Sequence, residues 1–311
     1  MDLHKKYTLK IKLCQHRAIG YNKAKGTGII EKDTKLTLKP MPNASVLSQI
    51  PREKQIAKVL QKIIFGKKVK CPHCGRQSSV VKLVKHKVWR CNKCRKKFSL
   101  TSINWLKAMK ISLQDLWLLI WCWQKQLGLQ QTKNVVGLSL PTVRRYYELF
   151  RDNLQTNLEV ILEGTVQMDE MFVNGAFIMG AKDTERKRIK LEVVYKKSPN
   201  KTDAMNMIFK HVKPGSKLYT DGGSIYCGCE KWWPIKHGRD IHKKGQFGLT
   251  SEIEGVWANL RTFIRRMYHH VTLKKLAKVI AEFEARFSHL KIFDSPVNFL
   301  TNSLMPVPLA F

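Results

Sequence analysis

Three acidic residues in the second half of the chain lie where a carboxylate could take part in chemistry. The segment TVQMDEMFVNG, residues 165–175, predicts a buried strand that includes Phe172 and ends in a turn at Asn174 and Gly175. Asp169 interrupts this strand, in which an unpaired carboxylate is costly to desolvate. Asp221 follows the short expected strand KLYT and precedes two glycines, a position at which α/β sheets build sites. Glu254 lies in SEIEGVW, where a helix is expected to begin, and helical spacing predicts that it shares a packed face with Trp257 and Arg261.

These acids would share a site only with cations between them, because like charges raise one another's pKa. They lie 52 and 33 residues apart, a spacing that does not by itself bring them together. If they converge, their oxygens are expected to bind Mg²⁺ or Mn²⁺. Two ions bridged by the strand aspartate would clamp a phosphodiester for in-line attack by water or a 3′-hydroxyl. The alternative is a half-exposed strand that points one acid at water.

Four cysteines form two CxxC pairs, Cys71 with Cys74 and Cys91 with Cys94. A CxxC turn presents two thiolates to one tetrahedral zinc ion. The segment SSVVKLVKHKVWR between the pairs predicts two short strands that fold back, so that the pairs meet. The spacing therefore predicts a zinc ribbon that holds one structural Zn²⁺.

For the other histidines and cysteines near these pairs or elsewhere, the spacing gives weaker evidence of metal binding. His73 and His86 could replace a cysteine, but the four thiols suffice. The segment CGC, residues 227–229, is too tight for a standard knuckle, and we assign it no role. The other two cysteines, Cys14 and Cys122, have no partner at metal-binding spacing.

The charge of the chain points to a polyanionic partner. Among 311 residues, 57 Lys and Arg face 23 Asp and Glu, which gives a formal net charge of +34. Such an excess suits a protein that displaces counterions from a phosphate backbone. A basic membrane-surface protein is the rival class, but no segment has 18 uninterrupted apolar residues, so we expect no membrane span. The N-terminus shows no signal peptide, and a reducing cytoplasm is the expected compartment.

A helical segment follows the cysteines. Ser112 is expected to cap a buried helix that contains LWLLIWCW and ends at Gly128. A short helix, a break at Gly137 and a cap at Ser139 then precede a second helix.

The second helix is the candidate for reading a DNA groove. Its apolar residues share one face, which leaves Thr142, Arg144 and Arg145 outward. This spacing is typical of a helix-turn-helix motif. The alternative is an ordinary three-helix bundle with a solvated arginine pair.

The whole arrangement resembles the insertion-sequence DDE transposases of the ISXO type. The resemblance covers residues 50 to 290 and has a characteristic order: zinc ribbon, helix-turn-helix, then four blocks. In this chain the blocks are Asp169-Glu170 with Phe172, Val173 and Gly175; Thr220-Asp221-Gly222 with Tyr226; His242 with Gly245 and Phe247; and Ile253-Glu254 with Trp257 and Leu260.

The resemblance implies a fold and a set of functional residues. It implies an α/β catalytic domain of RNase H-like fold, in which Asp169, Asp221 and Glu254 hold the catalytic divalent ions. Where the family often has a lysine, this chain has Arg261, a cation that can still contact phosphate but binds as a planar fork. His242 is expected either to assist near the scissile phosphate or to be an ordinary surface residue.

The expected domains follow from the same resemblance. They are an unassigned basic extension (1–50), a zinc ribbon with its preceding helix (51–110), a helix-turn-helix segment (111–158), the catalytic domain (159–300) and a tail (301–311).

The implied function is a transposase that cleaves DNA at transposon ends and joins the freed 3′-hydroxyl to target DNA. The expected partners are terminal inverted repeats, target DNA and further copies of the chain, in the cytoplasm at the nucleoid. A non-enzymatic DNA-binding regulator and a nuclease without strand transfer are the alternatives.

Overall fold

The computed structural model describes residues 50–84, 88–102, 104–155, 160–240 and 249–304. Most of the expected extension, the end of the tail, and His242 with its block lie outside the described residues. The chain divides into two compact units. One comprises residues up to Trp123 together with Leu129–Tyr146, and the other comprises Gln124–Gly128 together with the chain from Tyr147 onward.

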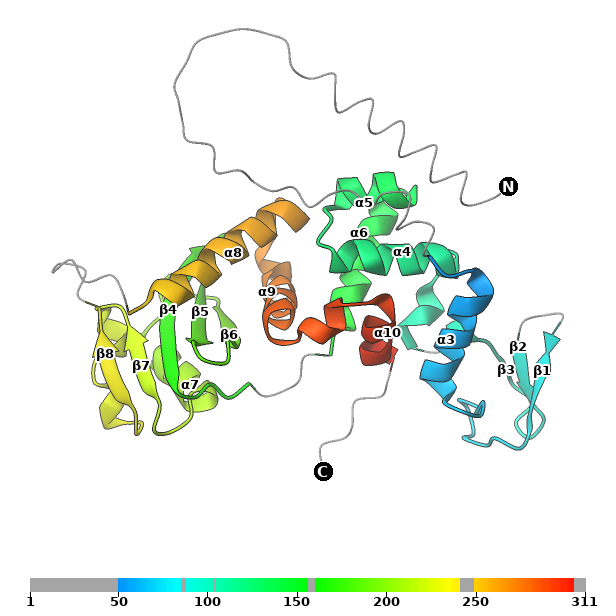
Figure 1. Ribbon diagram of the computed structural model, residues 1–311, viewed down its shortest axis with the longest axis horizontal. Helices are drawn as coiled ribbons and strands as arrows, with labels where there is room; N and C mark the ends of the chain where they lie inside the picture. The colour runs from blue at the N-terminus through cyan, green and yellow to red at the C-terminus, as the bar shows by residue number, and fades with distance from the viewer. Residues whose placement is uncertain (1–49, 85–87, 103, 156–159, 241–248, 305–311) are drawn as a thin grey trace, which may run out of the picture. The chain divides into compact units, whose positions relative to one another are not determined.

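The cysteine-rich part begins with helix α3 (Glu53–Phe65) and continues as a small antiparallel sheet (Figure 1). Its strands pair in the order β1 (Val80–Leu83), β2 (Val88–Cys91) and β3 (Lys97–Phe98). The two strands expected between the cysteine pairs are therefore confirmed, and β3 is added. Aromatic rings of α3, β2 and β3 form the core beneath the cysteines, with Trp89 stacked on Phe98 at 5.9 Å between ring centroids.

The helical segment follows two short 3₁₀ turns, Leu100–Ser102 and Asn104–Ala108. It contains α4 (Leu113–Gln124), α5 (Leu129–Val136) and α6 (Leu140–Asp152). Within the described residues, no helix is long and apolar enough to cross a membrane.

The expected cap of α4 is confirmed, but its expected end is not. Ser112 Oγ accepts the backbone N–H of Asp115 at 3.0 Å. The prediction that the helix ends at Gly128 is wrong, because α4 stops at Gln124 and Gln126 adopts the left-handed conformation with φ of 56°. A non-glycine residue in that region terminates the helix without a sequence signal.

The break and the outward residues of α6 agree with the sequence. Gly137 has a φ of 77°, and Ser139 Oγ accepts the N–H of Thr142 at 3.3 Å. Arg144 and Arg145 are exposed, whereas Thr142 is half-buried. A helix-turn-helix role for this segment stays a prediction.

A five-stranded mixed sheet forms the centre of the other unit, with the order β6-β5-β4-β7-β8. The central strand β4 is antiparallel to β5 and parallel to β7, which is in turn parallel to β8. The strands are β4 (Thr165–Val173), β5 (Ala176–Asp183), β6 (Ile189–Val194), β7 (Lys217–Thr220) and β8 (Lys236–Arg239).

The predicted turn after β4 is a two-residue hairpin. Asn174 and Gly175 have φ values of 48° and 89°, the left-handed pair that hairpin twist favours. The expectation that Phe172 is buried with the rest of the strand is wrong, since 59% of this residue is exposed. Its ring packs instead edge-on against Phe177 across the hairpin.

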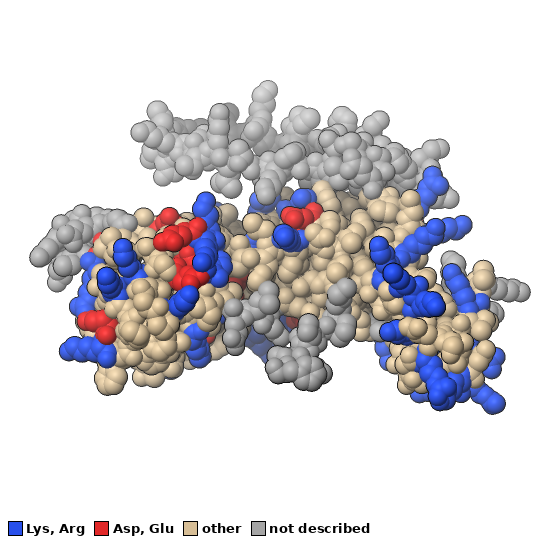
Figure 2. Space-filling model, turned by 60° about the horizontal axis from the view of Figure 1, so that its bottom comes forward, with Lys and Arg blue, Asp and Glu red and all other residues tan. Residues whose placement is uncertain are grey.

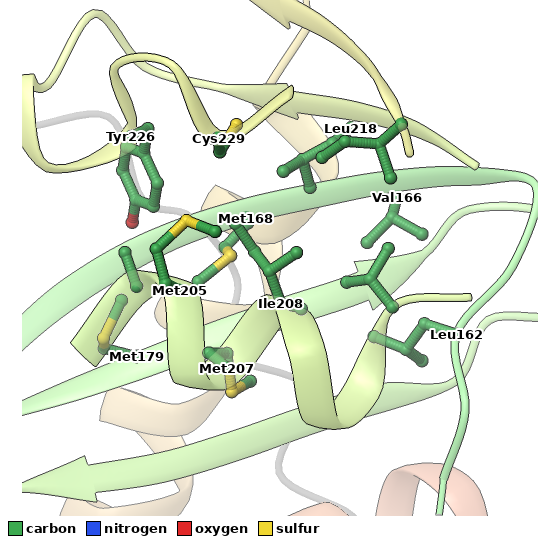
Figure 3. Packing of buried hydrophobic residues seen from close by; sticks show 14 of the residues in the cluster. Leu162, Val166, Met168, Met179, Met205, Met207, Ile208, Leu218, Tyr226 and Cys229 are labelled. Carbon is green, nitrogen blue, oxygen red and sulfur yellow. The ribbon is translucent and has the colours of Figure 1, made fainter. Parts of the chain in front are cut away.

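Helices cover both faces of the sheet. Helix α7 (Lys201–His211) packs its Met205 and Ile208 against Val166 and Met168 of β4, in the core that Figure 3 shows. Helices α8 (Ser251–Tyr268) and α9 (Leu273–Ser288) pack on the opposite face, and α10 (Pro296–Leu304) follows.

A buried ionic network joins the end of α6 to α9. Glu282 is fully buried and accepts hydrogen bonds from Arg286 Nε and Nη2 at 2.9 and 2.8 Å. Tyr268 Oη donates to the other oxygen of Glu282, and Arg151 lies over the Tyr268 ring with its Nη1 3.8 Å from the same carboxylate. Buried charges are tolerated because they are paired in this way.

Candidate active site

Three carboxylates meet where the parallel pairing of β4 with β7 ends, in the middle of β4 and directly after β7. The ladder pairs Met168 with Thr220, so the next residues of the two strands, Asp169 and Asp221, become neighbours. Asp169, Glu170 and Asp221 each place a carboxylate oxygen within 4.8 Å of the others. Asp169, the acid within an apolar strand, therefore belongs to a carboxylate cluster.

The surroundings disfavour ionisation of Asp169 and Glu170 when no cation is present. Burial raises the pKa of Asp169, and the charges of Asp221 and Glu254 raise it further against the hydrogen bond from Trp257. Burial likewise raises the pKa of Glu170. Burial and the charge of Glu170 raise the pKa of Tyr226 well above its usual value, so the hydroxyl keeps its proton and donates it to Glu170 Oε2 at 2.5 Å.

The start of α8 is fixed by two buried acceptors. Gln167, two residues before Asp169 on the same strand face, accepts the N–H groups of Glu252 and Ile253 at 2.9 and 3.0 Å. Asp240 Oδ2 accepts the backbone N–H and the hydroxyl of Thr250. The first N–H groups of a helix have no partner within the helix, so these acceptors determine where α8 begins.

Trp257 connects α8 directly to the carboxylate cluster. Its indole Nε1 donates to Asp169 Oδ2 at 2.8 Å, which leaves the other oxygen of Asp169 for a ligand. The indole fits because β5 has a glycine opposite Asp169: a Cβ on Gly180 would lie 2.3 Å from the Trp257 ring. Gly180 and Trp257 therefore set the orientation of Asp169 together.

The structure places Glu254 beside the cluster but not within it. Glu254 is exposed on α8, and its Oε1 lies 3.4 Å from Thr250 Oγ1 as a longer alternative to Asp240 for the hydroxyl proton, while its charge acts on Asp169. The expectation that Glu254 lies on a packed face with Trp257 is wrong, because Glu254 is exposed whereas Trp257 is buried against the sheet. Arg261 lies further along α8 and is exposed.

Glu252, the other acid at the start of this helix, lies apart. It pairs with Lys182 at 2.6 Å, and 45% of its side chain is exposed.

The four predicted zinc ligands converge in the ribbon. Cys71 Sγ lies 3.6 Å from Cys94 Sγ, and Cys74 Sγ lies 3.6 Å from Cys91 Sγ, with all four sulfurs within 4.8 Å of one another. Sulfurs bound to one tetrahedral zinc ion stand about 3.8 Å apart. The cluster therefore fits a structural zinc ion.

The sequence assigned no role to the residues that hold the site in place. For Glu170, the neighbouring acid Asp169 is a signal that could have suggested a role, and for Tyr226 the signal is its place in the same sequence block as Asp221. Gln167, Gly180 and Asp240 gave no signal, because each acts on a residue that is distant along the chain.

We expect the cysteine pairs to bind their zinc ion cooperatively. Replacing Cys71 and Cys74 by Ser together removes half of the ligands, so the variant should lose about one zinc ion per chain relative to the unmodified protein. Metal analysis of the purified chain by mass spectrometry checks this. Undiminished zinc in the double variant would show that the ion is bound elsewhere.

We expect Gly180→Ala to disturb the site through Trp257. The added methyl group should lower the free energy of unfolding by about 1–3 kcal/mol, as overpacking does. It should also weaken Mn²⁺ binding measured by calorimetry, since Asp169 loses its orienting partner.

Gly255→Ala is the matched control. A Cβ at Gly255 meets no atom within 4 Å, so this variant should gain about 0.5–1 kcal/mol of stability from helix propensity. Equal Mn²⁺ affinity and stability of Gly180→Ala and the unmodified chain would exclude the proposed role of Gly180.

Comparisons with known proteins agree with the described geometry. Residues 161–288 match the family model of the ISXO2-like transposase domain, and residues 51–97 match that of the transposase zinc-ribbon domain. No curated protein matches the chain. The crystal structure of the catalytic core domain of BIV integrase is similar over 39% of this chain and 80% of that chain, with 13% identity and a TM-score of 0.28.

The two family matches include the segments that carry the cysteine cluster and the carboxylate cluster. The expected RNase H-like α/β fold is confirmed by the family match and agrees with the mixed sheet order β6-β5-β4-β7-β8. The chain therefore carries the zinc-ribbon and DDE domains of the ISXO2-like transposases.

Proposed function

We propose that the chain is an active, divalent-metal-dependent transposase that cleaves DNA at the ends of its element and joins the freed 3′-hydroxyl to target DNA. The observation that carries this proposal is the cluster of Asp169, Glu170 and Asp221 where the pairing of β4 with β7 ends. A protein that only bound DNA would have no use for half-buried carboxylates such as Asp169 and Glu170, whose ionisation the fold opposes. This argues against the non-enzymatic regulator.

The donor set suits hard divalent ions. Asp169 retains one oxygen beside the Trp257 hydrogen bond, and Asp221 and Glu254 supply further carboxylates. Bound Mg²⁺ or Mn²⁺ would stabilise the attacking and leaving oxygens of an in-line displacement. Tyr226 and Trp257 hold Glu170 and Asp169 on opposite faces of β4, and the α8 contacts hold Glu254 beside them.

The basic surface would hold the DNA. Figure 2 shows Lys and Arg side chains spread over the ribbon, while Asp and Glu gather on the other unit. Arg144 and Arg145 are exposed on α6, and Arg261 is exposed on α8, seven residues after Glu254. We propose that Thr142, Arg144 and Arg145 contact the terminal repeats, that Arg261 contacts the scissile strand, and that copies of the chain assemble on the DNA.

We expect Glu254→Gln to abolish strand cleavage in Mg²⁺ while end binding and zinc content stay unchanged. The amide keeps the shape of the side chain but removes the charge that would hold the second ion. The readout is cleavage of a labelled duplex that carries an element end.

Glu252→Gln is the matched control, two residues away on the same helix. It loses a partly exposed ion pair with Lys182, which contributes little stability, so it should cleave near the unmodified rate. If Glu254→Gln still cleaved DNA and Glu252→Gln did not, Glu252 rather than Glu254 would be the third metal ligand.

We expect replacement of Arg144 and Arg145 by Ala to weaken binding to the element's ends. Loss of a base contact costs about 1–3 kcal/mol, and loss of a phosphate contact lowers the slope of affinity against salt. Fluorescence anisotropy at several salt concentrations separates the two effects. Unchanged affinity and salt dependence would place DNA recognition outside α6.

A further inference from the structure

A second cluster of metal-ligating side chains lies outside the proposed active site. Cys229 and Glu230 belong to the 3₁₀ turn η5 (Cys229–Lys231), and His237 belongs to β8. A sulfur, a carboxylate oxygen and a ring nitrogen of these residues all lie within 4.8 Å of one another. The CGC segment, whose spacing suggested no role, thus contributes one potential ligand.

The distances within this cluster fit a single ion. Cys229 Sγ lies 3.7 Å from Glu230 Oε2, and His237 Nδ1 lies 3.4 Å from the same oxygen. Around a tetrahedral zinc ion, a sulfur and an oxygen ligand stand about 3.5 Å apart, and a nitrogen and an oxygen about 3.3 Å. The fold therefore holds these atoms close to the spacing that zinc requires.

The hydrogen bonds of His237 leave the lone pair of one ring nitrogen, Nδ1, without a group that donates to it. The Thr220 hydroxyl donates its single proton to the backbone carbonyl of Asp221 at 2.8 Å, so it accepts from His237 Nε2 at 2.9 Å. In the neutral ring, Nδ1 then carries a lone pair. His237 is 2% exposed at its side chain, and its Nδ1 is buried without a hydrogen-bond partner.

A lone pair that faces a carboxylate oxygen at 3.4 Å is unfavourable unless a cation, either a proton on Nδ1 or a metal ion, lies between them. Histidine ligands of metals commonly have this arrangement, in which one nitrogen binds the ion and the other donates to an oxygen that fixes the ring. Here the fixing oxygen is Thr220 Oγ1.

We propose that Cys229, Glu230 and His237 bind a second zinc ion, distinct from that of the ribbon. A thiolate, an imidazole and a carboxylate form a donor set that selects zinc over Mg²⁺. Three protein ligands leave the fourth position to water, and solvent reaches it because 40% of the Glu230 side chain is exposed.

The bound ion would brace the segment that follows Asp221. Cys229 is fully buried in the core beside Tyr226 (Figure 3), and His237 is linked through Thr220 to the carbonyl of Asp221. Zinc would thereby connect η5 to β8 and hold the backbone of Asp221 in place.

Zinc analysis of the full-length chain tests the proposal without any measurement of activity. The unmodified protein should carry about two zinc ions per chain, one in the ribbon and one at this site. Glu230→Gln and Cys229→Ala should each reduce the content to about one. Glu230 is partly exposed, so its substitution leaves the core intact even if Cys229→Ala disturbs folding.

Cys227→Ser is the matched control, because Cys227 lies two residues from Cys229 in the same segment and is exposed. It should retain both ions. One zinc per chain that disappears entirely with the ribbon cysteines, or unchanged zinc in Glu230→Gln, would overturn the proposal. Loss of zinc in Cys227→Ser but not in Cys229→Ala would overturn the assigned ligands.

Cobalt substitution gives a second, spectroscopic test. In the chain that carries Cys71→Ser and Cys74→Ser, bound Co²⁺ should show thiolate-to-cobalt charge-transfer absorption that Cys229→Ala removes and Cys227→Ser keeps. Absorption that does not respond to Cys229→Ala would overturn the proposal.

Discussion

The docking of α8 onto β4 is the contact on which the proposed active site depends. Gln167 and Asp169 point to the same face of the strand, where the first accepts two N–H groups of the helix start and the second accepts the Trp257 indole. A buried glutamine and a helix terminus each need partners, and each satisfies the other here. One strand thus supplies an acid and also fixes the helix that carries Glu254.

The positive and the negative side chains of this protein are expected to bind different partners, namely DNA and metal ions. The chain has a net charge of +34, which favours contact with a phosphate backbone, yet a group of acids lies where the pairing of β4 with β7 ends. In their ionised form these acids would repel the same phosphates until cations bound among them. Metal and nucleic acid would therefore favour each other's binding, since the ions convert a repulsive patch into an attractive one.

Local sequence patterns were enough to predict most of the helices and strands. An apolar run and turn residues predicted β4 and its hairpin, and a short strand before two glycines predicted β7 and Asp221. The failures have two causes. Gln126 ended α4 before Gly128 by a left-handed backbone conformation that its residue type does not signal. Phe172 was set by its cross-strand contact with Phe177, and Trp257 packed on the sheet while Glu254 stayed exposed. The fit of Trp257 against Gly180 could not be inferred, since it requires knowing which residue lies opposite Asp169.

The buried charges around Glu282 limit how short an autonomous catalytic fragment can be. Arg151 contributes to this network but lies before residue 161, where the family match begins. A fragment cut at that boundary would keep Glu282 and Tyr268 and lose one of their cations. Removing one partner of a buried ion pair costs about 3–5 kcal/mol, a large share of the roughly 5–15 kcal/mol that stabilises a domain. The last turns of α6 are therefore part of the catalytic body, and dissection of the chain should begin upstream of Tyr147.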